Sequence, residues 1–148
     1  MITETKTVDI LLVEDNAEDA ELALAALKAR SMGDKVLHLM GGEQVIDFIA
    51  ANSWSAGAPA ENAPKLILLD LQLSGMGGLE VLQQLKVRER TRPIPVVVFT
   101  GSDSRTQMWA SYRLGANGYV VKPIEPRKYA QLVGDIAYYW LVVNRSFY

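Results

Sequence analysis

The chain has 148 residues, 49% of them hydrophobic, and its 15 basic and 17 acidic side chains give a formal net charge of -2. This size and composition suit one compact domain, and the lack of excess positive charge argues against direct DNA or RNA binding. Cysteine is absent, which excludes disulfides, cysteine-based zinc sites and thiol catalysis.

The amino-terminal segment, Met1 to Thr7, is polar and lacks the basic and apolar regions of a signal peptide. No apolar run approaches the roughly 20 residues that a membrane-spanning helix requires. We therefore expect a cytoplasmic protein that does not associate with a membrane.

Five short runs rich in valine, isoleucine and leucine recur along the chain. Four of them are almost continuously apolar, as expected for parallel strands buried on both faces. The second alternates more and contains His38, so we expect it at an edge of the sheet. The five predicted strands are Val8 to Val13, Lys35 to Met40, Leu66 to Leu69, Ile94 to Phe99, and Tyr119 to Val121.

Amphipathic segments separate these strands. The first predicted helix repeats apolar residues at helical spacing from Ala20 to Leu27, with Asn16 as its N-cap. The last keeps this spacing from Tyr129 to Val143 and begins at Pro126, a residue suited to a first turn. The stretch from Ala51 to Lys65 predicts an extended loop. Three other predicted helices lie around Val45–Ile49, Leu79–Leu85 and Met108–Tyr112. Alternating strands and helices indicate a doubly wound parallel α/β sheet.

Polar side chains follow four of the predicted strands. Glu14 and Asp15 end the first, Asp70 the third, Thr100 the fourth and Lys122 the fifth. Because sites in open α/β sheets form at the carboxyl ends of the strands, we expect these groups to converge. Taken singly, each has an ordinary structural explanation, such as complementing a helix dipole, but together they favour a shared site.

Three carboxylates in one depression repel one another unless a cation favours their charged forms. Mg²⁺ meets this need, because it prefers oxygen ligands and binds through one or two carboxylates plus waters and phosphate oxygens. Asp15 and Asp70 would ligate it directly, Glu14 would hold a coordinated water, and the backbone carbonyl of Gln72 would complete the shell. A histidine-rich metal site is excluded, since His38 is the only histidine.

A carboxylate beside Mg²⁺ can accept a phosphoryl group, and aspartyl phosphates are known intermediates. Asp70 is the predicted nucleophile. Lys122 would neutralise one phosphoryl oxygen, and the Thr100 hydroxyl would donate a hydrogen bond to another.

The chain resembles the receiver domains of response regulators along almost its whole length. The resemblance rests on the acidic pair in LLVEDN, the phosphoacceptor in LILLDLQLSGMGGLEVL, the hydroxyl residue in VVVFTGS and the lysine in GYVVKP. These correspond to Glu14-Asp15, Asp70, Thr100 and Lys122, and Tyr119 falls at the switch aromatic of the family.

The resemblance implies a (βα)₅ flavodoxin-like fold with strand order 2-1-3-4-5. It also implies a single receiver domain over residues 1–148, with its core at 7–137 and an aromatic helical extension at 138–148. Such a protein signals within a two-component phosphorelay: a sensor histidine kinase donates the phosphoryl group in a Mg²⁺-dependent reaction. The chain would be no enzyme beyond supporting its own phosphorylation and dephosphorylation.

Several positions refine this resemblance. In the family, the bond before the proline at Pro123 is usually cis, as a deliberately placed proline allows. Ser74 stands where proline is usual and Gly77 where an acidic residue is common, which would alter loop stiffness and phosphoryl lifetime. Gln72 and Ser102 occupy positions that tune dephosphorylation.

Three segments look more narrowly like the receivers that partner bacterial phytochromes: the long loop before the third strand, WASYRLGANGY, and AYYWLVVNRSFY. This resemblance implies a light-signalling response regulator that is phosphorylated by a bacteriophytochrome kinase.

The tail is apolar on every side of a helix, so one face is surplus to the core. We expect a homodimer through the fifth helix and the tail, assisted by the fourth helix and fifth strand, unless the long loop or Phe147-Tyr148 covers this face. Phosphorylation would draw Thr100 toward Asp70 and let Tyr119 turn, reshaping the fourth-helix face. The predicted interface residues are Tyr138, Tyr139, Trp140, Leu141, Val142 and Val143.

Three alternatives remain open from the residues. An aspartyl-phosphate phosphatase would carry Asp-x-Asp after the first strand, where this chain has Glu14-Asp15-Asn16. A flavin or nucleotide binder would carry a glycine-rich or hydroxyl-rich phosphate loop at that turn. A degenerate receiver would bind partners without being phosphorylated.

Overall fold

The computed structural model describes residues 8–51 and 63–146. Within these ranges, five parallel strands form one sheet in the order β2-β1-β3-β4-β5. The predicted fold class and strand order are therefore confirmed. The strands are β1 (Ile10–Val13), β2 (Val36–Leu39), β3 (Leu66–Leu69), β4 (Val96–Thr100) and β5 (Gly118–Val121).

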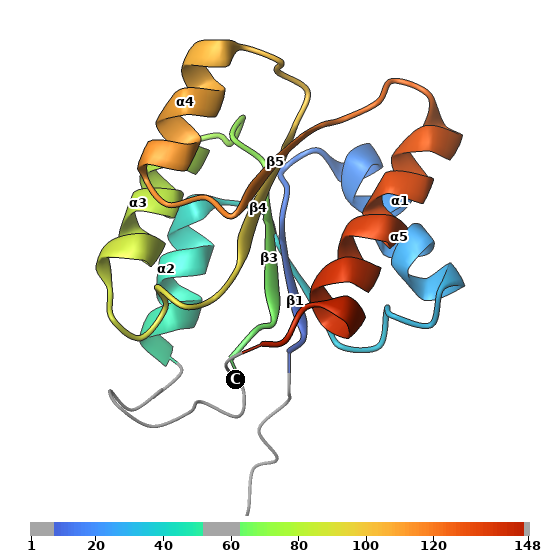
Figure 1. Ribbon diagram of the computed structural model, residues 1–148, viewed down its shortest axis with the longest axis horizontal. Helices are drawn as coiled ribbons and strands as arrows, with labels where there is room; N and C mark the ends of the chain where they lie inside the picture. Colours follow the sequence, from blue (N-terminus) through green and yellow to red (C-terminus); the bar gives the residue numbers. More distant parts are fainter. Residues whose placement is uncertain (1–7, 52–62, 147–148) are drawn as a thin grey trace, which may run out of the picture.

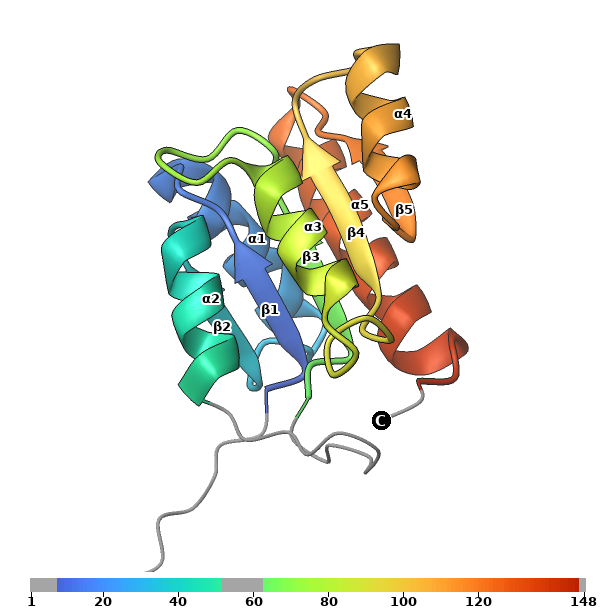
Figure 2. The same ribbon diagram turned by 90° about the vertical axis from the view of Figure 1, so that its left-hand side faces the viewer.

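Helices cover both faces of the sheet, as Figure 1 shows with the sheet seen nearly edge-on. Two of them, α1 (Ala17–Ala29) and α5 (Pro126–Tyr138), pack side by side on one face. The turned view of Figure 2 shows the other three in front of the sheet. These are α2 (Gly42–Ala51), α3 (Gly78–Val87) and α4 (Arg105–Arg113).

Each face of the sheet has its own hydrophobic core. Every residue of β1, β3 and β4 is buried, whereas β2 is half-buried at the sheet edge, as its alternating sequence predicts. Side chains alternate across a strand, so Leu11 and Val13 pack toward α2 and α3 while Ile10 and Leu12 pack toward α1 and α5. The carboxyl ends of the buried strands are thereby held rigidly at one end of the molecule.

Two helix starts follow the sequence signals closely. The Asn16 side chain accepts a hydrogen bond from the Asp19 backbone N–H at 2.9 Å, so Asn16 is the N-cap of α1 as expected. Pro126 occupies the first turn of α5, where its missing N–H needs no partner.

The carboxyl-terminal helix differs from the regular one predicted up to Val143. α5 ends at Tyr138, and a π-helical turn, η1 (Tyr139–Val143), follows. The wider turn is closed by a 2.6 Å hydrogen bond from the Asn144 N–H to the carbonyl of Tyr139, five residues earlier. Trp140 and Leu141 pack against the core. The exposed fractions of Tyr138, Tyr139, Val142 and Val143 range from 48% to 59%.

The peptide bond before Pro123 differs from the expected isomer. The described residues contain no cis peptide bond, so the bond before Pro123 is trans and the expected cis isomer is wrong for this structure. The trans form is the default because it is favoured by about 0.5–1 kcal/mol even before proline.

Most of the predicted loop from Ala51 to Lys65 lies outside the described residues. In the described part, no helix has the length and apolar character needed to cross a membrane.

Candidate functional site

Three predicted carboxylates meet at the carboxyl end of the sheet. Glu14 and Asp15 follow β1, and Asp70 follows β3. The two strands are parallel neighbours whose last residues, Val13 and Leu69, pair directly, so the residues after them lie side by side. One oxygen from each of the three carboxylates lies within 4.8 Å of the others.

This donor set fits a hard divalent cation. All three donors are carboxylate oxygens, the ligands that Mg²⁺ and similar ions prefer. Glu14 is only 2% exposed, and burial raises its pKa to about 7, with a further rise from its hydrogen bond with Asp70 and an opposing effect from Lys122. A cation bound among the three groups would favour their charged forms.

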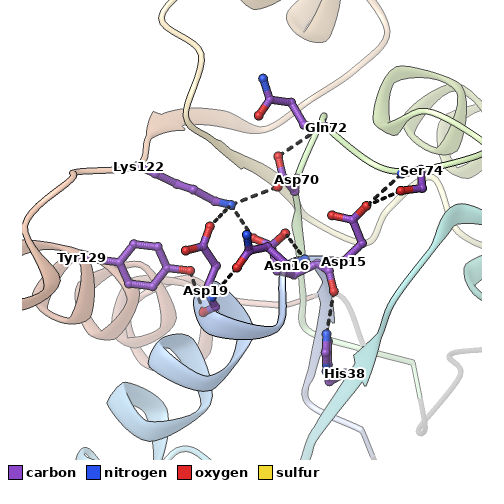
Figure 3. A network of polar contacts seen from close by, with 10 residues as sticks. Asp15, Asn16, Asp19, His38, Asp70, Gln72, Ser74, Lys122 and Tyr129 are labelled. Atoms are coloured by element: carbon purple, nitrogen blue, oxygen red, sulfur yellow. Dashed lines mark hydrogen bonds and ion pairs between the residues drawn. The ribbon is translucent and has the colours of Figure 1, made fainter.

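Lys122 follows β5, and its side chain extends toward Asp70 and Asp19 (Figure 3). Its Nζ lies 2.9 Å from Asp70 Oδ2 and 3.0 Å from Asp19 Oδ2, and it also donates to Glu14 Oε1. Burial lowers the pKa of Lys122, but the hydrogen bonds to Glu14, Asp70 and Asp19 outweigh burial and raise it above its ordinary value. The ammonium thus compensates the buried carboxylates.

Asp19 also belongs to this site, although nothing in the sequence marks it. This residue lies in the first turn of α1, where an acidic side chain is explained by the helix dipole alone. Its partner Lys122 is 103 residues away, so only the folded topology reveals the ion pair. The Tyr129 hydroxyl of α5 donates to the Asp19 carbonyl at 3.0 Å, which ties α5 to the same corner of the site.

Asp70 is held at both oxygens. Its Oδ1 accepts a 3.0 Å hydrogen bond from the Gln72 N–H, and its Oδ2 pairs with Lys122. Asp70 is only 5% exposed, yet its carboxylate adjoins that of half-buried Asp15. The Gln72 carbonyl as a metal ligand remains a prediction. His38 of β2 lies beside this site, and its Nε2 is 2.7 Å from the Glu14 carbonyl.

Asp15 has a different set of partners. Its Oδ2 accepts hydrogen bonds from both the N–H and the hydroxyl of Ser74, each at 2.9 Å (Figure 3). Ser74 belongs to the loop between β3 and α3, and the sequence analysis treated it only as a departure from proline. A serine in a loop gives no local sequence signal of a contact with a residue 59 positions away.

Thr100 is the last residue of β4, and Tyr119 lies on the neighbouring strand β5, where it pairs with Val98. Thr100 is fully buried, and its hydroxyl has no hydrogen-bond partner among the described residues. An unsatisfied buried hydroxyl is unfavourable by about 1–3 kcal/mol, so this group is suited to a ligand oxygen. The Tyr119 hydroxyl donates to the Ser102 carbonyl at 2.7 Å, and burial raises the pKa of Tyr119.

Comparison with known proteins agrees with this geometry. The profile of the response regulator receiver domain matches residues 10–134. The probable methanogenesis regulatory protein FilR2 of Methanothrix harundinacea is 36% identical over 137 residues, covering 93% of this chain and 86% of FilR2. Response regulator Rcp1 of Synechocystis sp. is 34% identical over 132 residues, covering 89% of this chain and 88% of Rcp1.

Solved structures show the same relationship. The phosphorylated cyanobacterial phytochrome response regulator RcpA superposes with a TM-score of 0.84 at 31% identity, covering 96% of this chain and 99% of RcpA. The Mn²⁺-bound form of Rcp1 superposes with a TM-score of 0.81 at 32% identity, covering 94% and 98%. The fold, the acidic cluster and these matches together show that the chain belongs to the response regulator receiver domain family, and it is similar to the phytochrome response regulator RcpA.

Proposed function

We propose that this receiver accepts a phosphoryl group on Asp70 from a sensor histidine kinase in a Mg²⁺-dependent reaction. The observation that carries the proposal is the convergence of three carboxylate oxygens within 4.8 Å beside the Lys122 ammonium. A structural ion pair would need one acidic partner for this lysine, whereas the site places several carboxylates around it. A divalent cation bound among these carboxylates would balance the negative charge that Lys122 alone does not neutralise.

The transfer chemistry follows from these positions. An oxygen of Asp70 forms a bond to phosphorus while the P–N bond of the donor phosphohistidine breaks, and the histidine nitrogen keeps the electron pair. Lys122 already contacts Asp70 Oδ2, so its ammonium can remain against the new phosphoryl group. The Thr100 hydroxyl, which has no partner among the described residues, supplies a donor to a second phosphoryl oxygen.

Asp15 and Asp70 would bind Mg²⁺ directly, Glu14 would act through a coordinated water, and the Gln72 carbonyl would complete the protein ligands. When bound, the ion neutralises charge on the transferring phosphoryl oxygens. Divalent cations in general suit this oxygen set, and Rcp1 binds Mn²⁺ in its solved form. Mg²⁺ is the ion we propose, because the site must hold phosphate oxygens as well.

Signal output would pass from Thr100 to the face formed by α4, β5 and α5. Movement of the Thr100 hydroxyl toward the phosphoryl group frees space for Tyr119, whose hydroxyl now contacts the Ser102 carbonyl. In this proposal the ring turns and changes the surface of α4. An Asp70→Asn chain that still changed its partner affinity after addition of a phosphodonor would refute this route.

Two partners belong to the proposal. The kinase is a bacteriophytochrome kinase acting in the cytoplasm. The likeness to the phytochrome response regulator RcpA supports the pairing with a phytochrome. The second partner is another copy of the chain, bound through the exposed aromatic and aliphatic side chains of the α5 end and η1. We propose no contact with DNA, consistent with the formal net charge of -2.

Phosphotransfer tests the proposed function directly. A bacteriophytochrome kinase labelled on histidine with radioactive phosphate is mixed with the chain and Mg²⁺, and both proteins are followed by gel. We expect label to leave the kinase and appear on the wild-type chain, but not on Asp70→Asn. Retention of label on the kinase with both chains would favour a receiver that acts without phosphorylation.

A further inference from the structure

Two residues of the loop between β3 and α3 contact the acidic cluster: Gln72 donates to Asp70, and Ser74 donates to Asp15. Both Ser74 donors, the backbone N–H and the hydroxyl, lie 2.9 Å from the same atom, Asp15 Oδ2. Two donors hold this one carboxylate oxygen in place and leave the other oxygen of Asp15 available for another partner. This is a two-point contact across 59 residues of sequence.

A second anchor fixes the position of this loop independently. Glu43 of α2 accepts a 2.9 Å hydrogen bond from the Met76 N–H. Gly75 adopts φ +73°, and a Cβ at that position would lie 2.8 Å from Glu43 Oε1, so the backbone approaches Glu43 as closely as glycine allows. The loop is therefore tied to α2 on one side of Ser74 and presents Ser74 to Asp15.

Asp15 differs from the other two carboxylates of the cluster. Lys122 contacts Glu14 and Asp70, and both side chains are nearly buried. The Asp15 side chain makes no ion pair within the described residues, and Ser74 supplies its hydrogen bonds there. Without Ser74, this half-exposed carboxylate would be free to rotate away from the other two.

We propose that Ser74 is a positioning residue for divalent-cation binding. By holding Asp15 Oδ2, it keeps the remaining oxygen of Asp15 oriented toward the acidic cluster. Hydrogen-bonding partners of ligating carboxylates act in this way, and their loss typically weakens metal binding by about 10–100-fold. The proposal rests on the proposed function, because it requires a metal among Glu14, Asp15 and Asp70.

Calorimetric titration of the full chain with Mg²⁺ alone tests this role without any phosphoryl transfer. Ser74→Ala removes the hydroxyl and keeps the N–H, and we expect the Mg²⁺ dissociation constant to rise by about 10-fold. Ser74→Thr keeps both donors and should restore an affinity within about twofold of wild type, because both hydrogen bonds to Asp15 are retained. The urea midpoint of the metal-free chain should stay unchanged in both variants.

A matched control separates Asp15 orientation from general loosening of the loop. Glu43→Ala removes the Met76 anchor without touching Asp15, so it should alter Mg²⁺ affinity far less than Ser74→Ala. Equal weakening by both variants, or affinity in Ser74→Ala that equals or exceeds wild type, would overturn the role of Ser74 while leaving the metal site intact. A wild-type chain that binds no Mg²⁺ would contradict both this role and the proposed function.

Discussion

The acidic end of the sheet and the carboxyl-terminal segment differ in the groups that they offer to a ligand or partner. The sheet end offers polar and charged groups, and the carboxyl-terminal segment offers apolar side chains. At the sheet end, Lys122 pairs with the buried Glu14 and Asp70 carboxylates, whereas the Thr100 hydroxyl has no partner among the described residues. At the α5 end and η1, Tyr138, Tyr139, Val142 and Val143 remain about half exposed, while Trp140 and Leu141 pack against the core. The first region needs small charged ligands, and the second needs an apolar surface.

Removal of the Lys122 charge should reduce the stability of the chain more than any other substitution considered for this comparison. Lys122→Met leaves Glu14 and Asp70 buried without their cation, and we expect a loss of about 3–5 kcal/mol in the free energy of unfolding. Urea denaturation without metal measures it. The control is Lys128→Met, because Lys128 is exposed and lies 3.8 Å from Glu125.

An exposed pair of this kind contributes at most about 1 kcal/mol. If Lys122→Met were as stable as Lys128→Met, the Lys122 ammonium would not stabilise the buried carboxylates of the sheet end. This result would contradict the charge balance proposed for that region.

Removal of the Thr100 hydroxyl should change the free energy of unfolding by a smaller amount. Thr100→Val keeps the shape and removes a buried donor that has no partner among the described residues, so we expect the unphosphorylated chain to gain about 1 kcal/mol. Thr91→Val is the matched control, because the equally buried Thr91 hydroxyl donates to the Leu85 carbonyl. That variant should lose about 1 kcal/mol. Equal losses in both variants would show that Thr100 is already satisfied.

The smallest effect on stability is expected at the carboxyl-terminal segment. Val142 is 59% exposed, so Val142→Glu should change the free energy of unfolding by less than about 0.5 kcal/mol. It should nevertheless shift the chain from dimer to monomer in light scattering, because it places a charge in the proposed interface. Val87→Glu, which alters a 61% exposed valine at the end of α3, should leave the dimer unchanged. A wild-type chain that is monomeric at high concentration would contradict the interface.

Features that depend on local sequence were predictable. The buried strands, the edge position of β2 and the N-cap Asn16 follow from apolar pattern and side-chain chemistry. The convergence of Glu14, Asp15 and Asp70 also follows, because parallel topology brings the ends of neighbouring strands together.

Features that depend on distant partners were not predictable in the same way. Asp19 and Ser74 gain their roles from Lys122 and Asp15, which lie 103 and 59 residues away. The turn after Tyr138 widens although the apolar spacing up to Val143 remains helical, since the choice between α and π turns depends on packing.

Every step of the proposed signalling begins with transfer of a phosphoryl group to the Asp70 carboxylate in the presence of a divalent ion. Incubation with acetyl phosphate and Mg²⁺, followed by intact-mass measurement, tests this transfer. We predict that wild type gains the mass of one phosphoryl group, that chelation of the metal prevents the gain, and that Asp70→Ala never shows it. An equal gain in Asp70→Ala, or no gain in wild type, would contradict the account.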